Sequence, residues 1–406
     1  MSSDSDTTTN QFREHAQSLL ALERRNRLRR LTPRQGHDFS SNDYLGLANS
    51  EELRQAIVRA ISRGVAIGSG GSRLLRGNDP EHEKLEAEAA EFFGAEAALY
   101  FASGFSANAA VLATLPQRGD VIVYDNLIHA SAHDGMKLSR AEKTAARHND
   151  AQAFEDVIKT WRKAGGKGRP WLAVESLYSM DGDVAPLDDL IGLAEAHDGV
   201  LLIDEAHATG VLGPQGRGLG AHLEGREDVL SLHTCGKALG AMGGLVCGSR
   251  LLIDYLVNRC RPFIYSTAPS PLMASAVRAA LELVKADTGD GPDSRRAAHR
   301  ELVTSAGSLL ESHCGIKPTG THIQPVIVGR DELAVCVAEA MQRRGFDVRA
   351  IRPPTVPEGS ARLRVPITMN VDASIFEAFA LALAEELAKV GLGAAEIAQV
   401  NQGAAV

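Results

Sequence analysis

Short apolar runs alternate with segments of helical periodicity along most of this chain. Residues 51–63 carry apolar side chains at four-residue spacing after Ser50, which favours a helix with a serine N-cap. A second helix is predicted over residues 81–93. Six apolar strands are expected, at residues 97–100, 121–124, 172–175, 200–204, 229–232 and 244–247. Because helical segments separate most of these strands, the pattern predicts an α/β fold with a mostly parallel central sheet flanked by helices.

A polar segment rich in glycine and aspartate, residues 287–294, interrupts this pattern and predicts a hinge. A helix, a strand at 323–328, a helix at 332–344 and a pair of strands at 347–351 and 361–367 are expected beyond it. That order suits a smaller α+β domain. The predicted organisation is therefore an N-terminal segment, a large domain and a small C-terminal domain, over residues 1–45, 46–286 and 287–406.

Composition narrows the class of protein. With 406 residues and 44% hydrophobic side chains, the chain can bury large cores in two or three domains. Its net charge of −8, with arginines clustered only around residues 24–30, disfavours nucleic acid and anionic membranes as partners. The five cysteines form no CxxC pair. Neither a secretory signal nor an apolar stretch of membrane-spanning length is seen, so a cytoplasmic location is expected.

Two residues carry the candidate chemistry. Asp204 ends the apolar run 200–204, and Lys237 follows in the Gly/Thr setting Thr234–Lys237. An aldehyde cofactor must be held by an amine, and a lysine does this when its surroundings favour the neutral form. A pyridine nitrogen stays protonated beside a buried carboxylate. Each residue alone is compatible with a structural role, but together they predict dependence on pyridoxal 5′-phosphate.

Two glycine-containing segments are candidates for binding the cofactor's phosphate. Ser103–Asn108 follows a predicted strand and precedes an apolar run, so it can offer N–H groups at a helix N-terminus. Alone, this segment also fits an ordinary strand-to-helix turn. The second segment, Gly68–Ser72, invites interpretation as a nucleotide-binding loop, but it lacks the Gly-Lys-Ser/Thr ending of a P-loop.

Three histidines are candidate site residues. His129 follows a predicted strand end, where open α/β sheets build their sites, and a structural role is equally compatible with this position. His207 lies three positions after Asp204, so the same strand end would direct both residues at one pocket. His133 follows His129 by four residues, but no HExxH glutamate accompanies the pair, and no metal is predicted.

Several ordered motifs resemble those of the α-oxoamine synthases, and the resemblance spans nearly the whole chain. The motifs are Ser40–Gly46 (SSNDYLG), Gly68–Arg73 (GSGGSR), Ser179–Asp183 (SMDGD), Asp204–Gly210 (DEAHATG) and Tyr265–Thr267 (YST). The family consists of fold-type I pyridoxal-phosphate enzymes, which condense an amino acid with an acyl thioester and release CO2. Within it, Ile351–Pro357 (IRPPTVP) followed by Ala361–Arg364 (ARLR) resembles the members that join L-alanine to a pimeloyl thioester in biotin biosynthesis.

The resemblance implies a role for each matching residue. Lys237 would hold the cofactor, Asp204 would pair with its pyridine nitrogen, and His129 would stack on its ring beside the substrate. The other implied cofactor contacts are Ser179 and His207 near the phenolic oxygen, Gly104, Phe105 and Thr234 around the phosphate, and Ser266 or Thr267 from a neighbouring subunit. The implied substrate contacts are Asn42 and Arg352 at the substrate carboxylate, Thr355 in the substrate site and Arg29 toward the acyl donor. A homodimer with its site at the subunit interface is also implied.

The sequence departs from common family forms in two places. The motif that begins at Asp204 reads Asp-Glu-Ala-His where Asp-Asp-Ala-His is common. The segment around Lys237 reads Thr-Cys-Gly-Lys-Ala, with Cys235, where a Phe-Gly-Lys-Gly form is familiar. Three alternative functions remain. One is another member of the family, such as 2-amino-3-ketobutyrate CoA ligase, which uses glycine and a shorter acyl group. The others are a nucleotide-dependent ATPase and a non-catalytic α/β binding protein.

Overall fold

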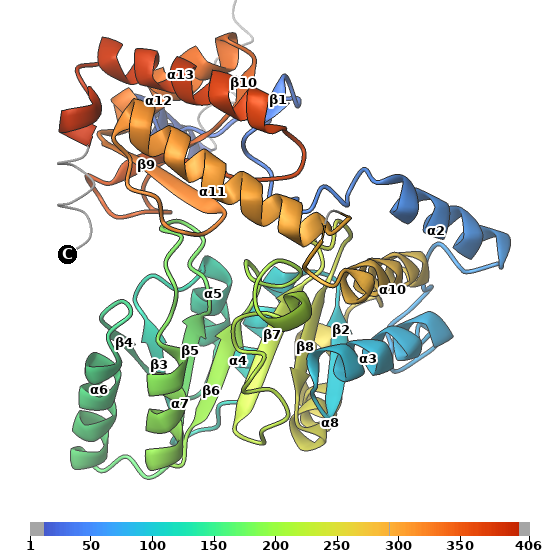
Figure 1. Ribbon diagram of the computed structural model, residues 1–406. Coiled ribbons are helices and arrows are strands. Elements are labelled where there is room, and N and C mark those ends of the chain that lie inside the picture. The colour runs from blue at the N-terminus through green and yellow to red at the C-terminus, as the bar shows by residue number, and fades with distance from the viewer. Residues whose placement is uncertain (1–11, 292, 398–406) are drawn as a thin grey trace, which may run out of the picture. The chain divides into compact units, whose positions relative to one another are not determined.

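The computed structural model describes residues 12–291 and 293–397 and divides them into two compact units (Figure 1). The large unit is Asn42–Arg300, and the small unit combines the residues up to Ser41 with those from Glu301 onward. The sequence places the domain changes at residues 46 and 287. In the structure the N-terminal segment belongs to the small unit because β1 (His37–Asp38) pairs in parallel with β10 (Phe346–Asp347).

A seven-stranded sheet forms the centre of the large unit, in the order β2-β8-β7-β6-β5-β3-β4. Its strands are β2 (Ala97–Phe101), β3 (Val121–Asp125), β4 (Glu142–Ala146), β5 (Pro170–Glu175), β6 (Val200–Asp204), β7 (Val229–Thr234) and β8 (Gly244–Gly248). Only β8 runs antiparallel to its neighbours. The six predicted strands are present. The edge strand β4 was missed, because its polar, mostly exposed residues lack the apolar signal of a buried strand.

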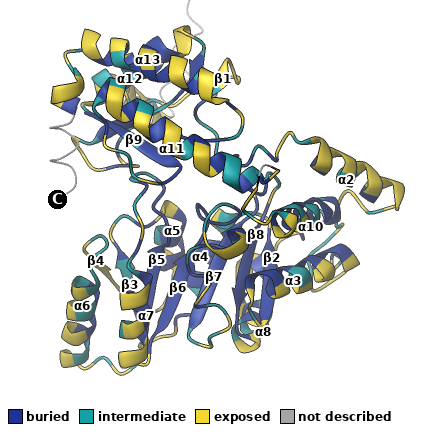
Figure 2. Ribbon diagram, in the orientation of Figure 1, coloured by how far each residue is buried: buried dark blue, intermediate teal, exposed yellow. Residues whose placement is uncertain are grey.

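Helices cover both faces of this sheet. The helices of the large unit are α2 (Glu51–Ser62), which packs on α10, and α3 (Pro80–Phe93), α4 (Gly104–Thr114), α5 (Ala130–Leu138), α6 (Ala151–Lys163), α7 (Leu187–Ala196), α8 (Arg250–Arg259), α9 (Arg261–Ile264) and α10 (Pro271–Ala286). Successive residues of β6 point to opposite faces: Leu202 packs with α4, α5 and α8, and Leu201 packs with α6 and α7. Figure 2 shows the central strands as a buried layer between helices with exposed outer faces.

The small unit is built around a three-stranded antiparallel sheet in the order β11-β12-β9. Its elements are α1 (Arg13–Arg24), α11 (Arg295–Cys314), α12 (Asp331–Arg343), α13 (Ala373–Lys389), β9 (Ile323–Gly329), β11 (Ala350–Ile351) and β12 (Ala361–Pro366); α11 contains the division between the units. The continuous strand expected at 347–351 was wrong. Phe346–Asp347 pairs with β1, and Ala350–Ile351 pairs with β12. Within the described ranges, no helix has the length and apolarity needed to cross a membrane.

Candidate active site

The C-terminal ends of four neighbouring strands of the large unit bring polar side chains to one edge of the sheet. Asp125, Glu175, Asp204 and Thr234 end β3, β5, β6 and β7. Glu175 and Asp204 are direct partners in the parallel register of β5 and β6. Open α/β sheets bind ligands at this edge, because the loops that leave the strands diverge there.

Asp204 is buried and held by two donors. Its Oδ2 accepts from the side-chain amide of Asn108 at 2.9 Å, and its Oδ1 accepts from the main-chain N–H of Ala206 at 2.9 Å. The same Asn108 amide also donates to Ser131 Oγ at 3.1 Å. Asp204 is therefore a carboxylate of fixed orientation at a strand end. Asn108 has no role assigned from the sequence, although it is the last residue of the Ser103–Asn108 segment.

Lys237 lies in the turn after β7, and its amine contacts His207. Nζ of Lys237 is 2.7 Å from Nε2 of His207, and Nδ1 of that ring is 2.6 Å from the hydroxyl oxygen of Tyr44. His207 follows Asp204 by three residues in a loop whose main chain folds back, with Ala208 N bonded to Glu205 O. The structure thus brings Lys237 and His207 together.

The N-terminus of α4 approaches Thr234 closely. A Cβ atom added to Gly104 would lie 3.0 Å from Thr234 Oγ1, so a side chain at this position would crowd the strand end. Ser103 caps the helix by accepting from Ser106 N at 3.1 Å. Because Gly104 and Phe105 lie in the first helical turn, their N–H groups have no partner within the helix. The three residues expected around a phosphate are therefore neighbours.

His129 is the N-cap of α5. Its Nδ1 accepts from Ser131 N at 3.2 Å and lies 2.8 Å from Ser131 Oγ, so Nε2 carries the proton of the neutral ring. Burial lowers the pKa of His129 below its ordinary value, and the charge of Lys237 adds to this effect while Asp204 opposes it. His129 is thus a neutral ring close to both residues. His133 instead packs edge-to-face on Tyr124, with ring centroids 5.3 Å apart.

Glu175 is a site residue that the sequence analysis missed. Its Oε2 accepts from Ser179 N at 3.3 Å, and its Oε1 is buried without a hydrogen-bond partner among the described residues. Burial raises the pKa of Glu175, the negative charge of Asp204 raises it further, and the result is a pKa of about 8. Glu175 is the last residue of a predicted strand, next to Asp204 in register, and that position was the available signal.

Ser266 and Thr267 are exposed, and their segment lies beside the glycine-rich segment Gly68–Arg73. Ala268 N donates to Gly71 O at 2.8 Å. Both the Ser69 hydroxyl and the His82 ring contact Pro269 O, at 2.6 and 2.7 Å.

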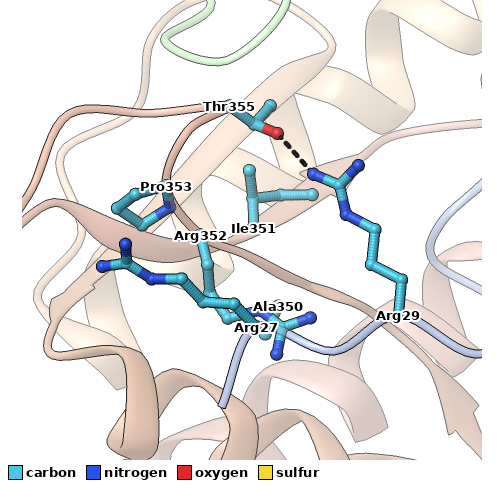
Figure 3. Close-up of a pocket in the computed structure, with 7 residues that line it drawn as sticks. All are labelled: Arg27, Arg29, Ala350, Ile351, Arg352, Pro353 and Thr355. Atoms are coloured by element: carbon cyan, nitrogen blue, oxygen red, sulfur yellow. Dashed lines mark hydrogen bonds between the residues drawn. The ribbon is translucent and has the colours of Figure 1, made fainter. Parts of the chain in front are cut away.

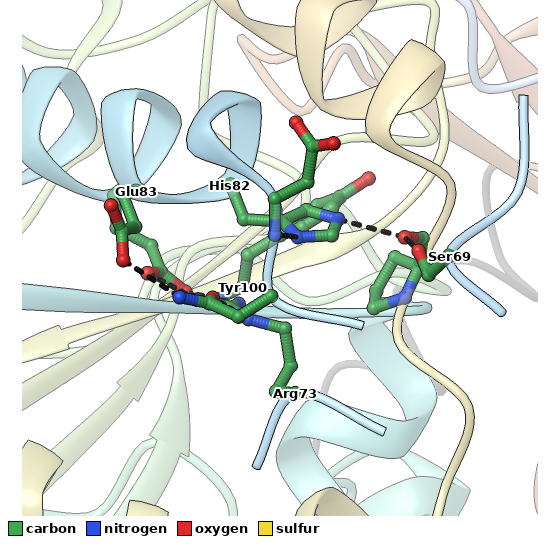
Figure 4. A network of polar contacts seen from close by, with 9 residues as sticks. Ser69, Arg73, His82, Glu83 and Tyr100 are labelled. Atoms are coloured by element: carbon green, nitrogen blue, oxygen red, sulfur yellow. Dashed lines mark hydrogen bonds and ion pairs between the residues drawn. The ribbon is translucent and has the colours of Figure 1, made fainter. Parts of the chain in front are cut away.

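Arg73 secures the glycine-rich segment from its other end. Its guanidinium forms two hydrogen bonds with the Glu86 carboxylate, at 2.7 and 2.8 Å, and Glu86 also accepts from Tyr100 N (Figure 4). A P-loop joins a strand directly to a helix, whereas this segment lies between α2 and α3 and binds the chain around Ala268. The interpretation as a nucleotide-binding loop is therefore wrong.

Arg29, Arg352 and Thr355 meet in the small unit, where they line a cavity of about 250 Å³ together with Arg27, Ala350, Ile351 and Pro353 (Figure 3). Arg29 donates to Thr355 Oγ1 at 3.2 Å, and Arg352 donates to the carbonyl oxygen of Asn26. Arg27 is paired with Asp331 and Glu358, both at 2.6 Å. Burial lowers the pKa of Arg352, as do the charges of Arg29 and Arg27. An anion in this cavity would relieve that repulsion.

Both departures from the common family forms have structural explanations. Glu205 is buried, and its longer side chain accepts from Ser176 Oγ at 2.6 Å and from Leu219 N at 3.1 Å, which ties a distant loop to β6. Cys235 is fully buried, and burial raises the pKa of its thiol, so it packs in the core and is not a reactive group.

These residues fit pyridoxal 5′-phosphate. The helix N-terminus at Gly104, kept clear of side-chain atoms beside Thr234, suits a phosphate. The oriented carboxylate of Asp204 suits a protonated ring nitrogen, and Lys237 supplies the amine. Oε1 of Glu175, which has no hydrogen-bond partner in the described part of the chain, shows that this edge retains buried hydrogen-bonding capacity. Among the described residues, no cluster of three or more His, Cys, Asp or Glu side chains could hold a metal ion.

Comparison with known proteins agrees with this geometry. Residues 34–379 match the family model for class I and II aminotransferases. The chain belongs to this family. It is 43% identical to the 8-amino-7-oxononanoate synthase of Chromobacterium violaceum over 341 residues, which cover 84% of this chain and 86% of that protein. The expected α-oxoamine synthase membership is therefore confirmed, and the protein is a pyridoxal-phosphate-dependent acyltransferase of this type.

Solved structures confirm the fold class, fold-type I with a smaller second domain. The 8-amino-7-oxononanoate synthase of Francisella tularensis is 26% identical to the chain and superposes with a TM-score of 0.72, covering 88% of this chain and 99% of that one. Serine palmitoyltransferase from Sphingomonas wittichii is 24% identical and has a TM-score of 0.81 over 96% of this chain and 99% of its own. This second likeness supports the fold alone.

Proposed function

We propose that this enzyme condenses L-alanine with a pimeloyl thioester to give 8-amino-7-oxononanoate, CO2 and the free thiol carrier, a step of biotin biosynthesis. The supporting observation is the similarity to 8-amino-7-oxononanoate synthases at about 40% identity over more than four fifths of the chain. The strand-end residues of the large unit supply the chemistry that such a condensation needs.

Pyridoxal phosphate, when bound, supplies an electron sink that stabilises negative charge at the α-carbon of an amino acid. Asp204, whose carboxylate is held in one orientation by Asn108 and Ala206, would keep a proton on the ring nitrogen. Lys237 holds the cofactor and later moves the α-proton of the amino acid at its Nζ atom. His129 would stack on the ring as a neutral imidazole and would help to exclude water.

The remaining cofactor contacts are proposed at its phenolic oxygen and at its phosphate. Ser179 and His207 bind the phenolic oxygen, and Gly104, Phe105 and Thr234 bind the phosphate. The proximity of Gly104 to Thr234 and of His207 to Lys237 supports these assignments.

Asn42 and Arg352 bind the substrate carboxylate, with Thr355 in the substrate site and Arg29 toward the acyl donor. The cation-rich cavity that Arg29, Arg352 and Thr355 line supports a site for an anionic substrate group. Arg352 presents a planar fork that binds a carboxylate through two parallel hydrogen bonds.

The partner of the large unit is a second copy of this chain. Ile67, Leu75 and Tyr265 are 75%, 84% and 72% exposed in or next to the joined glycine-rich and Tyr265–Thr267 segments, and exposed apolar side chains of this size favour association. Ser266 or Thr267 would then reach the phosphate of the neighbouring copy. All five cysteines are unpaired thiols, which supports a cytoplasmic location.

The substrates are tested with the purified enzyme supplied with pyridoxal phosphate. L-alanine is paired with pimeloyl-CoA in one assay and with pimeloyl-acyl carrier protein in another, and glycine with acetyl-CoA in a third. Mass spectrometry should detect 8-amino-7-oxononanoate from alanine with at least one pimeloyl donor. Faster turnover of glycine with acetyl-CoA would instead indicate 2-amino-3-ketobutyrate CoA ligase.

The dimer is tested by light scattering on variants of the exposed leucines. Leu75→Arg should shift the molecular mass toward that of the monomer. Leu251→Arg is a matched control, because Leu251 is 77% exposed on α8, away from the glycine-rich segment in sequence. A monomeric parent, or an unchanged dimer in Leu75→Arg, would contradict this interface.

A further inference from the structure

A series of short contacts leads from Lys237 into the interior of the large unit. Nζ of Lys237 lies 2.7 Å from Nε2 of His207, and Nδ1 of His207 lies 2.6 Å from the Tyr44 hydroxyl. Tyr44 donates in turn to Oδ1 of Asn42 at 3.1 Å. His207 and Tyr44 are 5% and 0% exposed, so bulk water does not compete for these contacts. The placement of each proton therefore decides what the neighbouring group can do.

The hydroxyl of Tyr44 has one proton, and the acceptor that receives it determines which nitrogen of His207 is protonated. When this proton is donated to Asn42, the Tyr44 oxygen can only accept from the imidazole, so Nδ1 carries the ring proton. Nε2 then presents a lone pair to Lys237. In the opposite tautomer Tyr44 would donate to Nδ1, and with the Asn42 amide oriented as in the structure the oxygens of Tyr44 and Asn42 would face each other at 3.1 Å without a proton between them. Burying such a pair of acceptors is unfavourable.

We propose that Tyr44 is a positioning residue that keeps the proton of His207 on Nδ1, so that Nε2 can take a proton from the ammonium group of Lys237. In this step an N–H bond of Lys237 breaks and an N–H bond forms at His207 Nε2. The positive charge moves from the ammonium to the imidazolium, whose Nδ1–H stays bonded to Tyr44. Lys237 is left as the neutral amine that attack on an aldehyde requires.

Tyr44 therefore acts on the cofactor-binding lysine through His207. Once Nε2 is protonated, His207 can donate a hydrogen bond to an anionic oxygen, which is consistent with its proposed place at the phenolic edge of the cofactor. The inference rests on the proposed function only for the role that it gives to Lys237. The tautomer of His207 is a property of the cofactor-free protein and can be measured there.

The first experiment measures the 15N shifts of histidine-labelled, cofactor-free protein at a pH where His207 is neutral, with the His207 signals assigned by their loss in His207→Asn. The wild-type protein should show a protonated Nδ1 and an unprotonated Nε2. A wild-type spectrum with the proton on Nε2 would overturn the proposal, and this result needs no variant of Tyr44 to fold.

The Tyr44→Phe variant keeps the aromatic ring and removes the hydroxyl, so the share of His207 with its proton on Nε2 should rise. Tyr100→Phe is the matched control, because Tyr100 is 1% exposed and loses a similar bond, from its hydroxyl to Met242 O at 2.6 Å. The control should leave the His207 shifts unchanged. Identical shifts in Tyr44→Phe and the wild type would show that Tyr44 does not set the tautomer.

A second experiment follows the attachment of pyridoxal phosphate to the cofactor-free protein by stopped-flow absorbance. Tyr44→Phe should slow attachment about tenfold, a typical effect of removing one buried hydrogen bond from a positioned group, and Tyr100→Phe should not. If Lys237→Ala still attaches the cofactor covalently, the proposed function fails, while the tautomer result stands by itself. If Lys237 attaches it at the same rate in Tyr44→Phe, the role of Tyr44 fails and the proposed function remains.

Discussion

At the strand ends of the large unit, Glu175 and Asp204 are buried carboxyl groups in adjacent register, and Asp204 is held by donors from α4 and from its own loop. In the small unit, three guanidinium groups line a cavity of about 250 Å³, and within residues 12–291 and 293–397 only Arg27 among them has carboxylate partners within 4 Å. In the first region, hydrogen bonds fix the orientation of a buried carboxylate. The second has an excess of positive charge directed at open space.

The difference indicates two functions: holding a reacting group in place and binding a ligand that is exchanged in each turnover. An oriented network suits a group that must be held in one position while bonds change, because it needs no reorganisation during the reaction. An open set of cations suits a ligand that enters and leaves with each turnover and brings its own negative charge. Changes at the strand ends should therefore affect the chemistry, and changes in the arginine cavity should affect substrate binding.

The largest effect is expected for Lys237→Ala. Without the amine of Lys237, covalent attachment of the cofactor and multiple turnover should both be abolished, although pyridoxal phosphate can still bind through its phosphate. Absorbance spectroscopy and a turnover assay measure the two effects. Normal multiple turnover in this variant would show that Lys237 does not hold the cofactor.

Asp204→Asn should be the next most damaging change. Asparagine keeps the shape but loses the charge that protonates the ring nitrogen, so kcat should fall by about 10²- to 10³-fold, equivalent to about 3–4 kcal/mol. The cofactor content, measured after denaturation, should stay close to that of the parent. Unchanged rates would place the ring nitrogen beside another group.

Arg352→Lys should produce a smaller effect of a different kind. Lysine retains the charge but lacks the planar fork, so the KM for alanine should rise about tenfold, equivalent to about 1.4 kcal/mol, while the cofactor remains bound. Steady-state kinetics separates KM from kcat. If both constants match those of the parent, Asn42 and Arg362 become the next candidates for the carboxylate.

A final effect, on stability and not on turnover, is expected at Glu175. Its pKa rises from 4.5 to about 8 on folding, so between these values the folded chain keeps a proton that the unfolded chain releases. The free energy of unfolding of the parent should therefore fall as pH rises through this window, relative to that of Glu175→Gln, which cannot titrate. Urea unfolding from pH 4.5 to 8 measures the difference. A difference that is independent of pH would mean that Glu175 is ionised in the folded state.

Much of the site could be predicted from local sequence. Asp204 and Lys237 were found because an acid at the end of an apolar run and a lysine in a Gly/Thr turn each have a local signature. Glu175 offers only its place at the end of a predicted strand, and the contact of Asn108 with Asp204 has no local signature. Glu175 becomes a site residue only because β5 pairs with β6 in one particular register, and Asn108 only because α4 brings it to Asp204.

The sequence by itself determined the strand–helix alternation, the buried strands and the family, since these depend on residue type and on spacing over short distances. The tertiary structure alone decided that β1 joins β10, that the glycine-rich segment binds the chain around Ala268, and that Tyr44 contacts His207. Each of these contacts joins residues more than 160 positions apart. Such pairs are selected by how the whole chain packs, because no pattern within a short window specifies a distant partner.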